Sequence, residues 1–108
     1  MTPFRVVYVT IDTPENAEKL ARALVERQQA ACVNIVPQIR SIYRWQGDIC
    51  DDPELLLIIK THASKLAGIQ QTVDELHPYE VAEMIALPIT AGSDAYLAWL
   101  DDVVNVDH

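Results

Sequence analysis

The fold is decided by two consecutive segments, ACVNIVPQIRSIYRWQ at residues 31–46 and ICDDPELLLIIKT at residues 49–61, which Gly47-Asp48 separates. Gly47-Asp48 is a turn signal, so the two segments are predicted to form a β-hairpin. The run from Leu55 to Ile59 is apolar throughout, which indicates a strand that is dry on both faces. In the first segment, alternation predicts one shared face for Val33, Ile35, Ile39, Tyr43 and Trp45.

Each strand of this hairpin contains a proline, Pro37 in the first and Pro53 in the second. Proline cannot donate a hydrogen bond to a neighbouring strand, so a bulge or a strand edge is expected at both positions. Residues 33–46 would reach about 45 Å when extended, at about 3.3 Å per residue. A compact chain of this length has a radius of gyration of only about 13 Å. The hairpin must therefore bend or project.

Signals for strands and helices alternate along the rest of the chain. A strand is predicted at residues 6–11, followed by a helix that Thr13 caps and Pro14 begins. A second helix is predicted from a Ser64 cap to about His77, then a strand at residues 83–89 and a last helix after Ser93-Asp94. The order β-α-β-β-α-β plus a C-terminal helix predicts an α+β fold of the ferredoxin-like type, with residues 1–108 forming a single domain.

The composition excludes several classes of function. The chain has 108 residues, 16 acidic against 8 Lys and Arg, and a net charge of −8, which argues against nucleic acid and against a polybasic membrane contact. No apolar run approaches the roughly 18 residues of a membrane span. Two cysteines, Cys32 and Cys50, are too few for a disulfide framework. Residues 1–5 do not resemble a signal segment, so the chain is expected to be cytoplasmic.

The apolar strands predict association between copies of the chain. The strands at residues 6–11 and 55–59 have no polar face, and the three predicted helices are too few to cover both sides of the sheet. The far end of the hairpin carries Tyr43, Arg44 and Trp45, and an aromatic strand end outside its own core is typical of an interface. We therefore expect a tight homo-oligomer in which these three residues contact a neighbour.

Four blocks of the sequence resemble the signature of the CutA family, the divalent-cation tolerance proteins. The similarity runs from Val6 to Leu100 in the same order and spacing. The blocks are Ala30–Pro37, Ser41–Gly47, Leu57–Thr61 and His77–Glu80. The resemblance implies a ferredoxin-like protomer in a stable homotrimer, similar in architecture to the PII signalling proteins. It also implies an association with copper or other divalent cations, and no established catalytic reaction.

The chain departs from the pattern of this family at three positions. Ala82 stands where many members carry Pro, which gives the turn before the last strand more freedom. Val9 and Leu76 stand where some bacterial members carry a Cys and a His that have been proposed as copper ligands. Of such a site, only His77 would remain.

Two residues are candidates for metal binding, His77 and Cys32, and each has a structural alternative. His77 is predicted to end a helix, where a histidine commonly bonds to backbone; otherwise it is a cleft residue that binds a cation. Cys32 begins a strand in an apolar stretch, which is typical of a buried thiol; as a metal ligand it would need partners from elsewhere in the fold. His62 and His108 have no neighbours that favour a site.

The same resemblance and the local chemistry suggest a ligand cleft in the assembled trimer. Tyr79, Glu80 and Glu83 are expected to line it beside His77, and Lys60 is expected either to pair with a glutamate there or to extend to solvent. The acidic residues near the hairpin are instead expected to form a solvated face, because they lack the glycine and the spacing of a calcium loop. They are Asp48, Asp51, Asp52 and Glu54.

Three functions follow as hypotheses. The first is a homotrimeric divalent-cation tolerance protein that binds copper, another divalent metal or a small ligand between subunits. The second is an enzyme that uses Cys32, or His77 with Tyr79, but the chain has no nucleophile motif or phosphate loop, so we expect no enzymatic activity. The third is a trimeric scaffold or PII-like signalling protein with no physiological metal.

Overall fold

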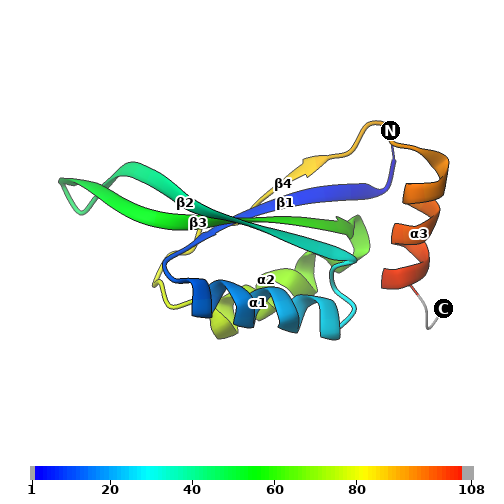
Figure 1. The fold of residues 1–108 in the computed structure, drawn as a ribbon, viewed down its shortest axis with the longest axis horizontal. Helices are drawn as coiled ribbons and strands as arrows, with labels where there is room; N and C mark the ends of the chain where they lie inside the picture. Colours follow the sequence, from blue (N-terminus) through cyan, green and yellow to red (C-terminus); the bar gives the residue numbers. More distant parts are fainter. Residues whose placement is uncertain (1, 106–108) are drawn as a thin grey trace.

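The computed structural model describes residues 2–105, in which one sheet of four strands carries two helices on one face and a third helix at one end (Figure 1). The strands run in the spatial order β2-β3-β1-β4, and all neighbouring strands are antiparallel. This is an α+β fold. Its elements are β1 (Phe4–Ile11), α1 (Pro14–Glu26), β2 (Cys32–Trp45), β3 (Asp48–His62), the 3₁₀ turn Ala63–Lys65, α2 (Leu66–Leu76), β4 (Ile85–Pro88) and α3 (Asp94–Val104).

The predicted caps are confirmed for the first and last helices but not for the middle one. The Thr13 hydroxyl accepts a hydrogen bond from the Asn16 backbone N–H at 3.1 Å. Ser93 accepts from the Tyr96 N–H at 3.3 Å. The prediction that Ser64 caps α2 is wrong, because the chain enters a 3₁₀ turn directly after β3. There His62 is the cap, and its Nδ1 accepts from the Ser64 backbone N–H at 3.0 Å.

The fourth strand is shorter than the predicted residues 83–89. Pairing with β1 begins with Ile85 opposite Tyr8 and ends with Pro88 opposite Arg5. Glu83 therefore lies in the segment that connects α2 to β4, not in the strand. This segment crosses from the helices to the edge of the sheet before it can pair (Figure 1).

A β-bulge in β2 overturns the predicted alternation of its side chains. Val36 pairs with Leu56 and Ile39 with Glu54, so three steps along β2 match only two along β3. The extra residue lies at Pro37-Gln38, where Gln38 has a positive φ of 61°. An extra residue shifts every later side chain to the opposite face. The residues beyond the bulge, Ile39, Tyr43 and Trp45, are therefore on the opposite face from Val33 and Ile35.

The core lies between α1, α2 and the face of the sheet that they cover. Side chains on this face are buried, and the predicted apolar stripe of α1 packs against them. They are Val7, Val9, Ile11, Leu55, Leu57 and Ile59. The C-terminal helix α3 makes a second, smaller cluster at the end of the sheet, with Phe4, Ala31, Leu100 and Val104.

The other face of the sheet has no helix over it, and we call it the open face (Figure 1). Residues directly opposite each other on neighbouring strands share a face, so Leu87, Val6 and Lys60 form one row and Ile85, Tyr8 and Ile58 the next. These apolar side chains stay partly or largely exposed in one chain. The molecule measures 45 × 25 × 22 Å because the hairpin projects beyond the helices, as predicted.

None of the helices within residues 2–105 combines the length and the apolar character that a membrane crossing requires.

Candidate functional site

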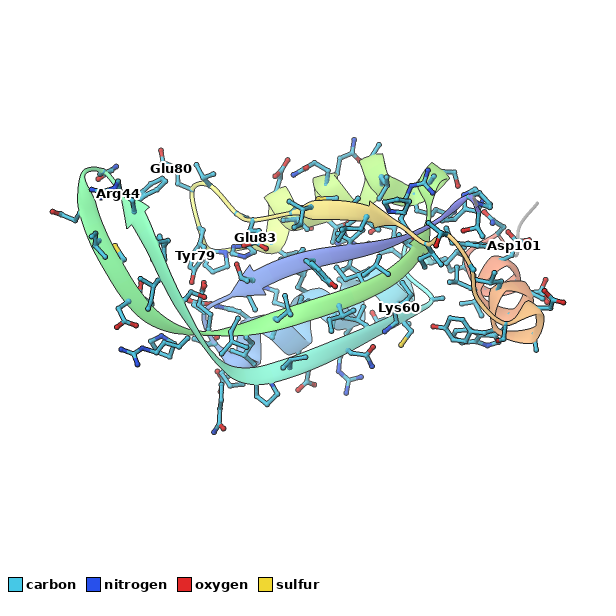
Figure 2. The ribbon with its side chains drawn as sticks, turned by 90° about the horizontal axis from the view of Figure 1, so that it is seen from above. Arg44, Lys60, Tyr79, Glu80, Glu83 and Asp101 are labelled. Carbon is cyan, nitrogen blue, oxygen red and sulfur yellow. The ribbon has the colours of Figure 1, made fainter. Side chains whose placement is uncertain are left out.

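A cavity of about 940 Å³ lies between the inner side of the hairpin and the segment 79–83. It continues the open face toward the tip of the hairpin, and it is walled by strand residues on one side and by the connection between α2 and β4 on the other (Figure 2). We call it the acidic cleft. Its lining includes Thr10, Asp12, Ser41, Ile42, Tyr43, Trp45, Asp52, Pro53, Glu54 and residues 79–83.

The β-bulge brings the aromatic and acidic residues of the hairpin to one side. Beyond the bulge, Ser41 pairs with Asp52 and Tyr43 pairs with Cys50, so these residues share the face of Glu54 and Leu56. The Tyr43 hydroxyl donates to Asp52 Oδ2 at 2.6 Å. This hydrogen bond and the nearby negative charge raise the pKa of Tyr43 to about 12. The phenol is therefore held neutral beside the carboxylate.

The prediction for Glu54 is wrong. It was expected on a solvated acidic face, but it is only 6% exposed. The segment 79–83 passes over it, and the Tyr79 hydroxyl donates to Glu54 Oε2 at 2.7 Å. Burial, and then the bond to Glu54, raises the pKa of Tyr79 well above its ordinary value. The period-two pattern places Glu54 on the open face with Leu56 and Ile58, but it does not indicate that this position is covered.

His77 ends α2 as predicted, and both of its ring nitrogens are bonded to backbone. Nε2 lies 2.7 Å from the Thr10 carbonyl oxygen, and Nδ1 accepts from the Tyr79 backbone N–H at 3.1 Å. Because Nδ1 accepts, Nε2 carries the proton and donates to Thr10. His77 is 8% exposed, and its ring packs edge-on against Tyr79. His77 thus fixes the segment that carries Tyr79. This arrangement corresponds to the structural alternative, a histidine that ends a helix and bonds to backbone.

Cys32 and Lys60 lie at the other end of the molecule. They pair with each other across β2 and β3 on the open face, and the Lys60 ammonium donates to the Asn34 side chain. Lys60 is six residues from Glu54 along β3, about 20 Å at about 3.3 Å per residue. Figure 2 shows Lys60 near α3, whereas Tyr79, Glu80 and Glu83 are at the hairpin end. A cleft that contains Lys60 and Tyr79 would therefore need two copies of the chain.

The residues of one protomer do not fit a copper site made by His77 and Cys32. The two side chains are at opposite ends of the sheet, and the imidazole nitrogens are already engaged. Within residues 2–105, no three His, Cys, Asp or Glu side chains are grouped closely enough to hold a metal ion. The cleft offers carboxylate and phenol oxygens, which suit Mg²⁺, Ca²⁺ or Mn²⁺ better than they suit copper.

The predicted interface residues are at the tip of the hairpin. Tyr43 and Trp45 are each 41% exposed, which is high for aromatic side chains and leaves them available to a neighbour. Arg44 lies between them in the sequence, and its guanidinium donates to the Gly47 carbonyl at 3.4 Å. Tyr43 and Trp45 also line the cleft.

All charged residues in the described lining of the cleft are acidic. Five carboxylates line it, and no Lys or Arg is among its described lining residues. Of the five, Asp12 accepts from the Asn16 side chain at 2.9 Å, whereas Asp52 and Glu54 accept from the two tyrosines. The other two are Glu80 and Glu83, both exposed. The electrostatic potential of the cleft is therefore negative.

The chain is similar to known proteins in both sequence and structure. The family described as "CutA1 divalent ion tolerance protein" matches residues 5–103. "Protein CutA, chloroplastic" of Arabidopsis thaliana is 53% identical over 91% of this chain, and "Divalent-cation tolerance protein CutA" of Thermus thermophilus is 50% identical over 88% of it. The solved structure of a "Periplasmic divalent cation tolerance protein CutA" from Archaeoglobus fulgidus has a TM-score of 0.91 at 37% identity, and the match covers 94% of this chain and 98% of that one.

The lengths of these relatives differ. The chain spans 92% of the Thermus thermophilus protein but only 54% of the Arabidopsis thaliana protein and 64% of the homologue from Xenopus laevis. The similarity therefore covers one shared region, to which the longer relatives add further sequence.

Proposed function

Because this chain belongs to the CutA1 divalent ion tolerance family, we propose that it is a homotrimeric protein of the response to divalent metal ions and that it binds a cation in the acidic cleft. The observation that carries the proposal is the set of five carboxylates around one cavity that has no basic residue in its described lining. Carboxylates that line one cavity without a basic residue make its potential negative, and an opposite charge is attracted there. A divalent cation, copper or another, supplies that charge.

The trimeric assembly is supported by the open face. Leu56, Ile58 and Tyr8 form an apolar surface on the side of the sheet without helices, and it continues into the exposed aromatic residues of the hairpin. A surface of this kind is characteristic of contacts between subunits. We propose that each copy covers the open face of its neighbours, with Tyr43, Arg44 and Trp45 in the contact.

For the protomer, we propose the ferredoxin-like arrangement with an additional C-terminal helix. Its support is the element order β-α-β-β-α-β together with the strand order β2-β3-β1-β4. We also propose a cytoplasmic location, as the sequence analysis predicted. The names of two relatives place those proteins elsewhere, one in the chloroplast and one in the periplasm.

Calorimetric titration with Mn²⁺, Zn²⁺ and Cu²⁺ tests the proposed cation site. We expect saturable binding of at least one of these ions, and we expect it to weaken in Glu54→Gln. His77→Ala tests the histidine as a ligand in the same titration. Because both ring nitrogens are bonded to backbone, we expect this variant to affect cation binding only by loosening the segment 79–83. Equal binding in wild type and Glu54→Gln would contradict a site in the cleft.

Light scattering tests the assembly. At protomer concentrations down to the nanomolar range we expect a trimer, because the open face of a single chain exposes too much apolar surface. A folded monomer at that dilution would contradict the proposal.

A trimeric scaffold or PII-like signalling protein with no physiological metal is the second candidate. The dispersed metal-ligating side chains within residues 2–105 favour it. It predicts the same trimer but no saturable metal binding. Under either proposal we expect no catalytic activity.

A further inference from the structure

A short stretch between α2 and β4 is attached to the rest of the chain through a single side chain. Residues 78–81, which we call the strap, cross from the helices toward the edge of the sheet (Figure 1). Tyr79 is half-buried, and the other three residues are exposed. Within residues 2–105, the strap takes part in no backbone–backbone hydrogen bond, and both of its hydrogen bonds there come from Tyr79.

Both ends of the strap are fixed in the core. On one side, the buried His77 is bonded through Nε2 to the Thr10 carbonyl at 2.7 Å. On the other side, Ala82 and Met84 pack against the main hydrophobic cluster. Exposed backbone and few buried contacts are the features of segments that open locally while the rest of a protein stays folded. The two buried ends therefore serve as hinge points, and the strap between them is free to move.

Tyr79 connects the strap to the hairpin. Its hydroxyl donates to Glu54 Oε2 at 2.7 Å, and its backbone N–H donates to His77 Nδ1 at 3.1 Å. The strap covers Glu54, which is only 6% exposed. When Tyr79 leaves this position, the carboxylate loses a donor but gains water, which solvates a charge better than a buried site does. Hydration thus offsets part of the lost hydrogen bond, and opening the strap costs less than separating the paired strands around it.

From these contacts we propose that the strap is a lid over Glu54. It opens as a unit on its two anchored ends while the sheet and the helices remain folded, and opening exposes the Glu54 carboxylate to solvent. The strap thereby regulates which molecules in solution reach this carboxylate, and Tyr79 determines the fraction of time that it is open. The inference goes beyond the proposed cation site and does not depend on it, because the contacts on which it rests lie within one chain.

The test is carboxyl labelling of the full-length protein with a water-soluble carbodiimide and an amine, followed by peptide mass spectrometry. Lids open in microseconds to seconds, so slow labelling measures the fraction of open molecules. We expect Glu54 to be labelled to completion, but at least about 30-fold more slowly than the exposed Glu26 of α1. Glu54 that stays unlabelled in the folded protein, or that reacts as fast as Glu26, would overturn the proposal.

Urea distinguishes opening of the strap from unfolding of the whole chain, and it does so without any variant. At about 1 M, urea raises the globally unfolded fraction by about fivefold or more. Opening four residues exposes little new surface, so the labelling of Glu54 should change by less than about twofold. If it rises by about fivefold or more, the carboxylate is exposed only by global unfolding, and the proposal is wrong.

Tyr79→Phe removes the hydroxyl that holds the strap and keeps the aromatic ring. We expect the labelling of Glu54 to accelerate by about 10–30-fold, as for the loss of a hydrogen bond to a charged group. Val81→Ala is the matched control, because it changes an exposed side chain of the same strap and leaves the Tyr79 bond intact. It should not alter the rate. An unchanged rate in Tyr79→Phe, or equal acceleration in the two variants, would contradict the role of Tyr79 and overturn the proposal.

Two further outcomes separate the lid from its alternatives. If a neighbouring copy holds the strap closed in the proposed trimer, Glu54 reacts only at dilutions at which the assembly dissociates, and that result would overturn the proposal. A rate that is constant across the concentrations of the assembled protein supports it. Local opening without saturable binding of Mn²⁺ or Cu²⁺ supports the lid and contradicts the proposed cation site, whereas saturable binding without local opening overturns the lid alone.

Discussion

Replacing Tyr79 by Phe removes a single hydroxyl group and leaves Glu54 buried without its donor. A hydrogen bond to a charged group contributes about 1.5–3 kcal/mol to stability. The Tyr79 side chain is only half-buried, so water replaces part of the lost bond. We therefore expect Tyr79→Phe to lower the free energy of unfolding by about 1.5–2 kcal/mol at pH 7.

Urea unfolding followed by circular dichroism measures this change. With a slope of about 1–3 kcal/mol per molar urea, the midpoint should fall by about 1 M. The protomer concentration must be the same for all variants, because the proposed assembly would contribute to the apparent stability. Tyr43→Phe is the matched control. It removes the same group from a bond of similar length to Asp52, but at an exposed position.

The comparison of the two variants decides whether burial is the cause. We expect a clearly smaller loss for Tyr43→Phe, because water readily solvates an exposed carboxylate. If the two variants lose equal stability, or if Tyr79→Phe loses less than about 0.5 kcal/mol, the bond to Glu54 does not hold the segment 79–83 in place. In that case, the loss of stability in the double variant Tyr79→Phe/Glu54→Gln should equal the sum of the losses in the two single variants.

Three further outcomes are expected. Leu57→Ala should lower the free energy of unfolding by about 2–5 kcal/mol, because Leu57 is fully buried; a loss below about 1 kcal/mol in urea unfolding would contradict that burial. Folding raises the pKa of Tyr43 from 10.0 to about 12, so the folded state holds the phenol proton to higher pH than the unfolded state does. The stability that the protonated Tyr43 contributes is therefore intact below pH 10 and is lost between pH 10 and 12. Urea midpoints that fall as steeply over this range in Tyr43→Phe as in wild type would refute this. Gln38→Val should lower the free energy of unfolding by about 1 kcal/mol or more, because a β-branched residue is strained at the positive φ of 61°. Gln38→Gly should leave the stability nearly unchanged, and thermal unfolding measures both variants.

The regular elements were predictable because their signals are local. Thr13-Pro14 places a cap and a first helical residue side by side, and Gly47 supplies the positive φ of 86° that the hairpin turn requires. The apolar run at 55–59 indicates a strand, and its alternate residues Leu55, Leu57 and Ile59 are buried beneath the helices. Each of these inferences depends on residues within a few positions of each other.

The cleft was only partly predictable because it depends on contacts between distant segments. The sequence predicts Tyr79, Glu80 and Glu83 together, since they are adjacent in the chain. It does not predict Glu54, because its burial requires the segment 79–83 to pass over β3. Similarly, the pairing of His77 with the Thr10 carbonyl joins residues 67 positions apart, and no local pattern distinguishes it from a metal-binding histidine.

The bulge at Pro37-Gln38 connects the proposed assembly of the molecule to the proposed cation site. Without the extra residue, Tyr43 would be on the face opposite to Asp52 and Glu54, and the aromatic end of the hairpin would not line the cleft. With it, Tyr43 and Trp45 belong both to the cavity and to the proposed subunit contact. A ligand that binds the assembled form more tightly than the single chain must then strengthen assembly by the same factor, because linkage between two binding equilibria is reciprocal.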